Sequence, residues 1–257
     1  MSAPLLEAAN LHLRFGAVRA LDGVNVEIFP GEVVAIVGES GSGKSTLLRV
    51  LAGAMDAEAG TVLYRDAEGE AQDIHALSEA GRRKLMRSDW GFVHQNARDG
   101  LRMSISAGGN VGERLMAAGN RNYGDIRAQA ADWMARVEMD PARIDEAPRN
   151  FSGGMQQRLQ IARCLVTNPR LVFMDEPTGG LDVSVQAKLL DLIRGLVSQL
   201  GLAVFFVTHD IAAARLLAHR IVVMRHGRVV EEGLADRVLD DPRHAYTQLL
   251  VSSVLAA

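Results

Sequence analysis

A glycine-rich segment between an apolar run and a helical run constrains the fold more than any other part of the sequence. The apolar run is Val33–Val37, and the next nine residues read Gly-Glu-Ser-Gly-Ser-Gly-Lys-Ser-Thr. A short run rich in Val and Ile predicts a buried strand, and the stretch Ser45–Ala54 predicts a helix. The chain must therefore pass from a strand through a tight loop directly into a helix, which favours an α/β fold.

Other apolar runs extend this prediction to a sheet. Three more short runs read as buried strands: Leu171–Met174, Leu202–Val207 and Ile221–Met224. Helical stretches separate most of them, and Val185–Leu200 has its leucines at helical spacing. This alternation predicts a mainly parallel sheet. The first 30 residues alternate in polarity around a turn, which predicts a small antiparallel sheet.

The middle of the chain has a different character. It contains no apolar strand run, and its predicted helices are Asn110–Ala118 and Tyr123–Glu138. We interpret it as a helical insertion. The prediction is a single domain over residues 1–257, with an α/β lobe formed by 1–95 and 156–257 and a helical subdomain at 96–155.

Composition excludes several classes of protein. The 257 residues carry a formal net charge of −3 with 5% aromatics, which argues against binding nucleic acid by overall charge or by base stacking. One cysteine, Cys164, excludes an internal disulfide and a four-cysteine cluster, and we expect it to be a small buried residue. No apolar run approaches the ~20 residues of a membrane-spanning helix, and the N-terminus does not resemble a secretory signal. We expect a cytoplasmic protein with no direct membrane insertion.

The glycine-rich segment has the spacing GxxxxGK[ST] of a phosphate-binding loop, or P-loop. Its glycines allow backbone N–H groups to face phosphate oxygens, and the following helix adds partial positive charge. Lys44 is predicted to reach the β- and γ-phosphates of ATP, and the Ser45 hydroxyl to bind Mg²⁺. The alternative is a glycine-rich turn with an incidental lysine. The predicted nucleotide-binding residues are Gly38, Glu39, Ser40, Gly41, Ser42, Gly43, Lys44, Ser45 and Thr46.

Two acids end the apolar run Leu171–Met174. Asp175 is predicted to join the Mg²⁺ ligands, and Glu176 to act as a general base toward water. The alternative is an exposed acidic strand end.

Between these motifs lies Ser152-Gly153-Gly154-Met155-Gln156, at the start of a predicted helix. Together the three motifs resemble the nucleotide-binding domain of ABC ATPases, over essentially the whole chain. The resemblance implies an ABC-type P-loop domain, with a RecA-like parallel-sheet lobe, a small antiparallel sheet and an inserted helical subdomain. It also implies ATP hydrolysis with Mg²⁺, using Glu176, His209 and Lys44 as catalytic groups.

The same resemblance implies a head-to-tail dimer. Ser152, Gly153 and Gly154 would contact the γ-phosphate bound by the partner subunit, while by themselves they would be only a capped helix start. The partner is either a second copy of this chain or a second ABC protein. Met155 departs from the commoner glutamine and cannot donate to a ribose, and Phe151 departs from the commoner leucine, which we expect to be a packing difference.

Four further residues match the family by position. Phe15 is expected to stack on adenine, the alternative being a core phenylalanine. Gln95 is expected to contact Mg²⁺ and to link the lobes. Asp182 matches the D-loop and can also cap a helix. His209 follows a predicted buried strand and is expected to contact the γ-phosphate.

Within the family, the sequence is similar to the ATP-binding subunits of carbon–phosphorus lyase systems. The similarity includes the segments Asp99–Arg102, Ser106–Met116 and Tyr246–Leu255. The resemblance implies docking on the lyase core, including its radical iron–sulfur subunit, with Arg102 and Arg114 as candidate docking residues. The alternative is the ATPase of an oligopeptide or nickel importer. A DNA-repair ATPase is excluded by the lack of zinc cysteines, a coiled-coil insertion and excess positive charge.

Overall fold

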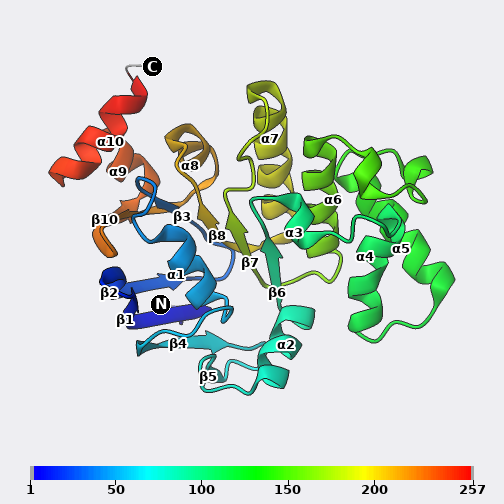
Figure 1. Cartoon of the computed structure of the whole chain (residues 1–257), viewed down its shortest axis with the longest axis horizontal. Helices are drawn as coiled ribbons and strands as arrows, with labels where there is room; N and C mark the ends of the chain where they lie inside the picture. The colour runs from blue at the N-terminus through cyan, green and yellow to red at the C-terminus, as the bar shows by residue number, and fades with distance from the viewer. Residues whose placement is uncertain (1–2, 256–257) are drawn as a thin grey trace. The chain divides into compact units, whose positions relative to one another are not determined.

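The computed structural model describes residues 3–255, which belong to two compact units (Figure 1). The first unit combines residues 1–82 with 201–257, and the second comprises residues 83–200. The helical region predicted at 96–155 lies wholly inside the second unit. The proposed division into a lobe and a subdomain stays a prediction, and the two units are described separately.

The first unit begins with an antiparallel sheet. Its strands are β1 (Leu6–Phe15), β2 (Val18–Ile28), β4 (Ala59–Arg65) and β5 (Ala71–Asp73), in the order β2-β1-β4-β5. Buried and less buried residues alternate along most of β1, as expected when one face of a strand is covered. The small antiparallel sheet predicted for the first 30 residues is confirmed.

The first unit also contains parallel strands. β3 (Val33–Val37) pairs in parallel with β8 (Ala203–Val207) and β9 (Arg220–Arg225), and β10 (Arg228–Leu234) adds an antiparallel edge. Every residue of β3 and β8 is buried, which explains their continuous apolar sequences. The unit's helices are α1 (Lys44–Leu51), α8 (Ile211–Leu217), α9 (Ala235–Asp240) and α10 (Ala245–Leu255).

The second unit places helices around two parallel strands, β6 (Trp90–Val93) and β7 (Leu171–Asp175). Trp90 and Phe173 meet edge to face across this pair, with ring centroids 5.5 Å apart. The helix α2 (Glu79–Ser88) crosses the boundary between the units. The remaining helices are α3 (Ala97–Gly100), α4 (Ala107–Ala117), α5 (Tyr123–Arg136), α6 (Gly153–Leu165) and α7 (Val183–Leu200), with 3-10 turns at Pro141–Arg143 and Pro148–Asn150. None of the helices in residues 3–255 is both long and apolar enough to cross a bilayer.

Helix α4 forms although it contains three glycines. A Cβ at Gly108 would lie 2.5 Å from Ile144 Cγ1, and one at Gly112 would lie 2.6 Å from Ile126 Cγ2. The glycines therefore allow neighbouring segments to approach closely, which compensates for their low helix propensity. Asn110, fully buried in the same helix, accepts from the Arg102 N–H at 2.7 Å and donates to three backbone carbonyls of the preceding loop. This asparagine fixes residues 102–106 to the helix.

Cys164 is buried on α6, as predicted. A Cβ at Gly91 would lie 2.2 Å from the Cys164 sulfur, so only a glycine leaves room for the thiol there. Burial raises the pKa of the Cys164 thiol to about 12, because a thiolate removed from water is disfavoured more than the nearby Arg114 and Arg163 favour it.

This shift predicts slow alkylation of the folded protein. The thiolate is the reactive form, so a raised pKa keeps Cys164 neutral from neutral pH up to strongly alkaline pH. At pH 8 we expect iodoacetamide to label Cys164 at least ~100-fold more slowly in the folded chain than in denaturant. Mass spectrometry gives the extent of labelling directly, because this is the only cysteine. Equal rates in both states would contradict the buried position.

Candidate nucleotide site

The P-loop joins β3 to α1 in the first unit, as the sequence predicts. Gly38 and Gly43 have φ values of 148° and 106°, which favour glycine. A Cβ at Gly38 would lie 2.2 Å from the Met224 carbonyl oxygen, and one at Gly43 would lie 2.4 Å from the Ala20 carbonyl oxygen. Neighbouring backbone therefore excludes any side chain at both positions, and the loop has the conformation that only its glycines permit.

Lys44 begins helix α1, and its ammonium group is turned back over the loop. Nζ donates to the carbonyl oxygens of Gly38 at 2.8 Å and Glu39 at 2.7 Å, and the residue is only 5% exposed. The side chain therefore already lies inside the loop that would surround the phosphates. The first N–H groups of a helix lack carbonyl partners within the helix, so the start of α1 also favours an anion.

Phe15 lies at the end of β1 and is 52% exposed. A large apolar side chain with this exposure is not part of the core, so the alternative of a core phenylalanine is wrong. Stacking on adenine is compatible with the exposed ring and stays a prediction.

His209 follows the buried strand β8, as expected. Thr208 before it donates its backbone N–H to the Ile36 carbonyl at 3.2 Å. Asp210 after it caps α8 by accepting from the N–H groups of Ala212 and Ala213. His209 itself is exposed between these two anchored neighbours. Its position is thus fixed by the backbone on both sides, and its contact with a γ-phosphate stays a prediction.

The second unit brings Gln95 and the two acids together. Asp175 is the last residue of β7 and is 5% exposed, and Glu176 follows it. The Gln95 Nε2 atom donates to Glu176 Oε2 at 3.1 Å. Glu176 has a φ of 43°, a left-handed conformation that strains a glutamate. This arrangement favours the general-base role over a simple exposed strand end.

Ser152 is the N-cap of α6. Its Oγ accepts from the Met155 N–H at 3.4 Å, while Ser152 and Gly153 are exposed and Gly154 is partly exposed. The two residues that depart from the common motif, Phe151 and Met155, both contact Arg143. Its guanidinium lies 4.6 Å above the centre of the Phe151 ring, and its Nη1 donates to Met155 Sδ at 3.6 Å. Phe151 is 5% exposed, which agrees with a packing difference.

Asp182 lies in the exposed loop before α7. Its backbone carbonyl accepts from the N–H groups of Val185 and Gln186, both at 2.9 Å, so the residue forms the start of the helix. Its side chain is exposed, which a contact with a second subunit requires.

Two buried glutamines were missed by the sequence analysis. Gln157 and Gln160 on α6 are 3% and 2% exposed, and both donate to the His94 carbonyl oxygen, at 3.1 and 3.0 Å. Gln160 Oε1 also accepts the His94 N–H at 2.8 Å. They therefore fix the residue immediately before Gln95. The sequence did contain a signal for this role: Gln157 and Gln160 are three residues apart and lie among the apolar positions of a predicted helix.

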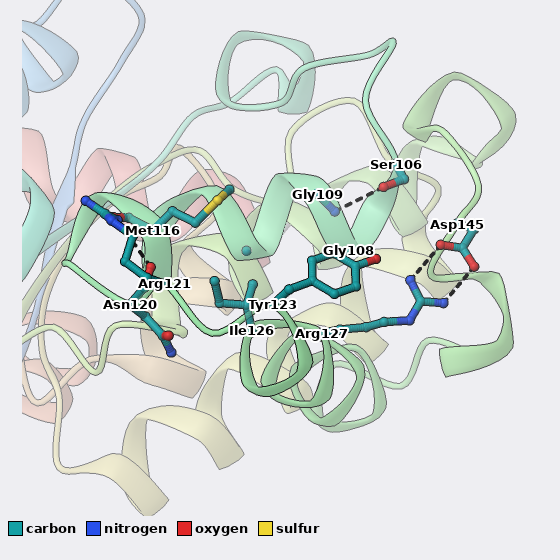
Figure 2. Close-up of a pocket in the computed structure, with 11 residues that line it drawn as sticks. Ser106, Gly108, Gly109, Met116, Asn120, Arg121, Tyr123, Ile126, Arg127 and Asp145 are labelled. Atoms are coloured by element: carbon teal, nitrogen blue, oxygen red, sulfur yellow. Dashed lines mark hydrogen bonds and ion pairs between the residues drawn. The ribbon is translucent and has the colours of Figure 1, made fainter.

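A cavity of about 260 Å³ lies between α4 and α5, and the sequence did not predict it (Figure 2). Met116 and Tyr123 on its rim are 45% and 73% exposed. Arg127 forms two 2.7 Å hydrogen bonds to Asp145, and these lower the pKa of that carboxyl group. Figure 2 shows this pair at one end of the cavity and the Tyr123 ring beside it. The exposed Met116 and Tyr123 side chains make this rim a candidate contact surface.

Comparison with known proteins gives consistent matches. A family model described as ABC transporter matches residues 21–179. The chain is 60% identical over 255 residues to the phosphonates utilization ATP-binding protein PhnK of Escherichia coli, with 99% of both chains covered. It is 36% identical over 256 residues to the dipeptide transport ATP-binding protein DppD of Escherichia coli, covering 97% of this chain and 78% of that protein. A solved dimeric structure of the ATP-binding cassette MJ0796 in a post-hydrolysis state, bound to ADP and Pi, matches with a TM-score of 0.79 and 31% identity, covering 90% of this chain and 98% of that one.

Proposed function

Because the chain belongs to the ABC transporter family of ATPases, we propose that it is the ATP-hydrolysing subunit of a phosphonate-utilization system. The predicted cassette fold is confirmed, as are ATP binding and ATP hydrolysis as the activity of the family. The observation that carries the phosphonate assignment is the 60% identity to PhnK over nearly the whole of both chains.

The proposed nucleotide-site residues have separate roles. The P-loop with Lys44 binds the phosphates, and His209 and Lys44 stabilise charge on the γ-phosphate. Glu176 orients the attacking water, and Gln95 holds the Glu176 carboxylate. Phe15 would stack on adenine.

The donor set fits Mg²⁺. Ser45 offers a hydroxyl, Asp175 a carboxylate and Gln95 an amide oxygen, and hard oxygen ligands are what this ion prefers. When bound, the ion would neutralise charge on the β- and γ-phosphates. These three residues are the proposed ligands.

We further propose that two subunits form a head-to-tail dimer. The exposed Ser152 and Gly153, with Gly154, would contact ATP bound by the partner, and exposed Asp182 would lie at the same interface. The dimeric ATP-binding cassette to which the chain is similar supports this assembly. The partner would be a second copy or a second ABC protein.

The proposed docking target is the core of a carbon–phosphorus lyase, including its radical iron–sulfur subunit. The exposed rim around the α4–α5 cavity, within the predicted helical subdomain, supports this proposal. Of the two arginines considered for docking, Arg102 has an exposed side chain, which is paired with Glu113 at 2.6 Å. Arg114 is less exposed, and its guanidinium donates to the carbonyls of Met86 and Trp90, so it also holds the fold.

The importer alternative rests on the 36% identity to DppD. A tagged copy of this chain, recovered from its native cells grown on a phosphonate as sole phosphorus source, separates the two functions. Mass spectrometry should identify lyase subunits among the co-purified proteins. Recovery of a membrane permease without lyase subunits would assign the chain to the importers.

The docking surface is tested by Tyr123→Ala in the same pull-down. Loss of an exposed aromatic anchor should reduce recovered lyase core by about tenfold or more, because such residues dominate interface energies. The matched control is Leu249→Ala, a 63% exposed leucine of the first unit. ATP affinity should stay within about twofold of wild type in both variants. Full recovery of the core with Tyr123→Ala would place docking elsewhere.

A further inference from the structure

The last helix of the first unit reaches the P-loop. Tyr246, near the start of α10, is 4% exposed, and its hydroxyl accepts a 2.9 Å hydrogen bond from the Glu39 N–H. The guanidinium of Arg225 covers its ring at 4.8 Å from the centroid. A side chain 207 positions along the chain thus touches the backbone of the loop.

This contact completes the hold on the Glu39 peptide group. The Glu39 N–H donates to Tyr246, and the Gly38 carbonyl of the same peptide group accepts from the Lys44 ammonium at 2.8 Å. The same ammonium also donates to the Glu39 carbonyl at 2.7 Å. Gly38, just before it, packs against β9, where the Met224 carbonyl leaves no room for a side chain. When Lys44 turns to bind phosphates, the bond from Glu39 to Tyr246 remains to hold this part of the loop.

Tyr246 is itself anchored independently of the loop. Its N–H donates to His244 Nδ1 at 3.1 Å, and the His244 N–H donates to Glu231 Oε2 at 3.0 Å. Burial opposes ionisation of Glu231, but the neighbouring Thr247 hydroxyl and hydrogen bonds from two backbone N–H groups together lower its pKa. A charged carboxylate on β10 therefore fixes the start of α10.

We propose that Tyr246 is a positioning residue of the ATP site: its hydroxyl fixes the Glu39 peptide and so keeps the P-loop shaped for phosphate. A loop already held in its binding conformation loses less entropy when the ligand arrives, so affinity is higher. A phenylalanine would fill the same space without touching the loop. The inference rests on the proposed assignment of the P-loop.

The test is Tyr246→Phe in the full chain, which removes one oxygen and leaves the Glu39 N–H without its acceptor. We expect the Kd for MgATP to rise about fivefold, the effect of losing one ordinary hydrogen bond. The kcat at saturating ATP should stay within about twofold, and the melting temperature should fall by at most about 4 °C. Tyr123→Phe, at an exposed tyrosine of the second unit, is the matched control and should leave the Kd unchanged.

Each outcome decides the matter. An unchanged Kd in folded Tyr246→Phe overturns the inference, even with a lower melting temperature, because that pattern is what packing alone produces. Lys44→Ala, measured in parallel, distinguishes failure of the Tyr246 role from failure of the P-loop assignment. If it weakens binding while Tyr246→Phe does not, only the role of Tyr246 is lost; if neither does, the P-loop assignment fails as well.

A second measurement covers the case in which Tyr246→Phe does not fold. Hydrogen exchange of the Glu39 amide in the wild-type chain, with and without MgATP, reports the same bond. Slow exchange in both states supports the inference. Exchange at the rate of an unprotected amide overturns it.

Discussion

Replacing Glu176 by glutamine is expected to lower ATP turnover by at least about 100-fold while leaving ATP binding intact. An amide has nearly the shape of a carboxylate but cannot take a proton from water, and general-base catalysis contributes on this order. Because ATP remains uncleaved, the closed dimer should accumulate. Phosphate release gives the turnover, fluorescent-nucleotide titration gives the Kd, and light scattering gives the oligomeric state.

The chain offers a close control for this variant. Glu138 also has a positive φ, of 57°, and belongs to the same unit, but it forms an ion pair with Arg158 at 2.6 Å. Glu138→Gln should keep wild-type turnover. Unchanged turnover in Glu176→Gln would remove the general-base role, whereas equal losses in both variants would indicate a general effect on the fold.

The second large effect is expected for Lys44→Ala, which should weaken the binding of MgATP. Removing a charged donor to the phosphates should raise the Kd for MgATP by roughly 10- to 100-fold, the usual range for hydrogen bonds to charged groups. The ammonium also bridges the carbonyls of Gly38 and Glu39, so the empty loop should lose order as well. Calorimetric titration measures the affinity, and thermal melting shows whether the chain is folded.

Lys188→Ala, at an exposed position of α7, is the control and should bind ATP normally. An unaltered Kd in Lys44→Ala would contradict the assignment of this loop to phosphate binding. The pair of variants at Glu176 and Lys44 thus separates turnover from binding.

The sequence predicted those features that are determined within a short segment of the chain. The buried strands β3, β7 and β8 were recognisable because a short run rich in Val, Ile and Phe is typical of a strand in a covered sheet. The P-loop was recognisable because its glycines and lysine occupy a short fixed spacing. Both signals lie within about ten consecutive residues.

Contacts between distant segments were not predictable in this way. The hydrogen bond from Gln95 to Glu176 joins residues 81 positions apart. Phe151 and Met155 both contact Arg143, which lies in no recognisable sequence motif. The structural role of Arg114 was not predictable for the same reason, and its role in docking stays a prediction. Exposure of a long polar side chain depends on which carbonyl groups the fold brings near it, and these belong to other segments.

The glycines of α4 have a consequence for how this stretch can diverge among related proteins. A larger residue at Gly108 would displace Ile144, and one at Gly112 would displace Ile126, so either change demands a smaller partner at the same time. Asn110 imposes a similar requirement on the loop at 102–106, whose carbonyls and N–H it satisfies. Single substitutions at these positions are therefore expected to destabilise the segment unless the contacting residues change with them.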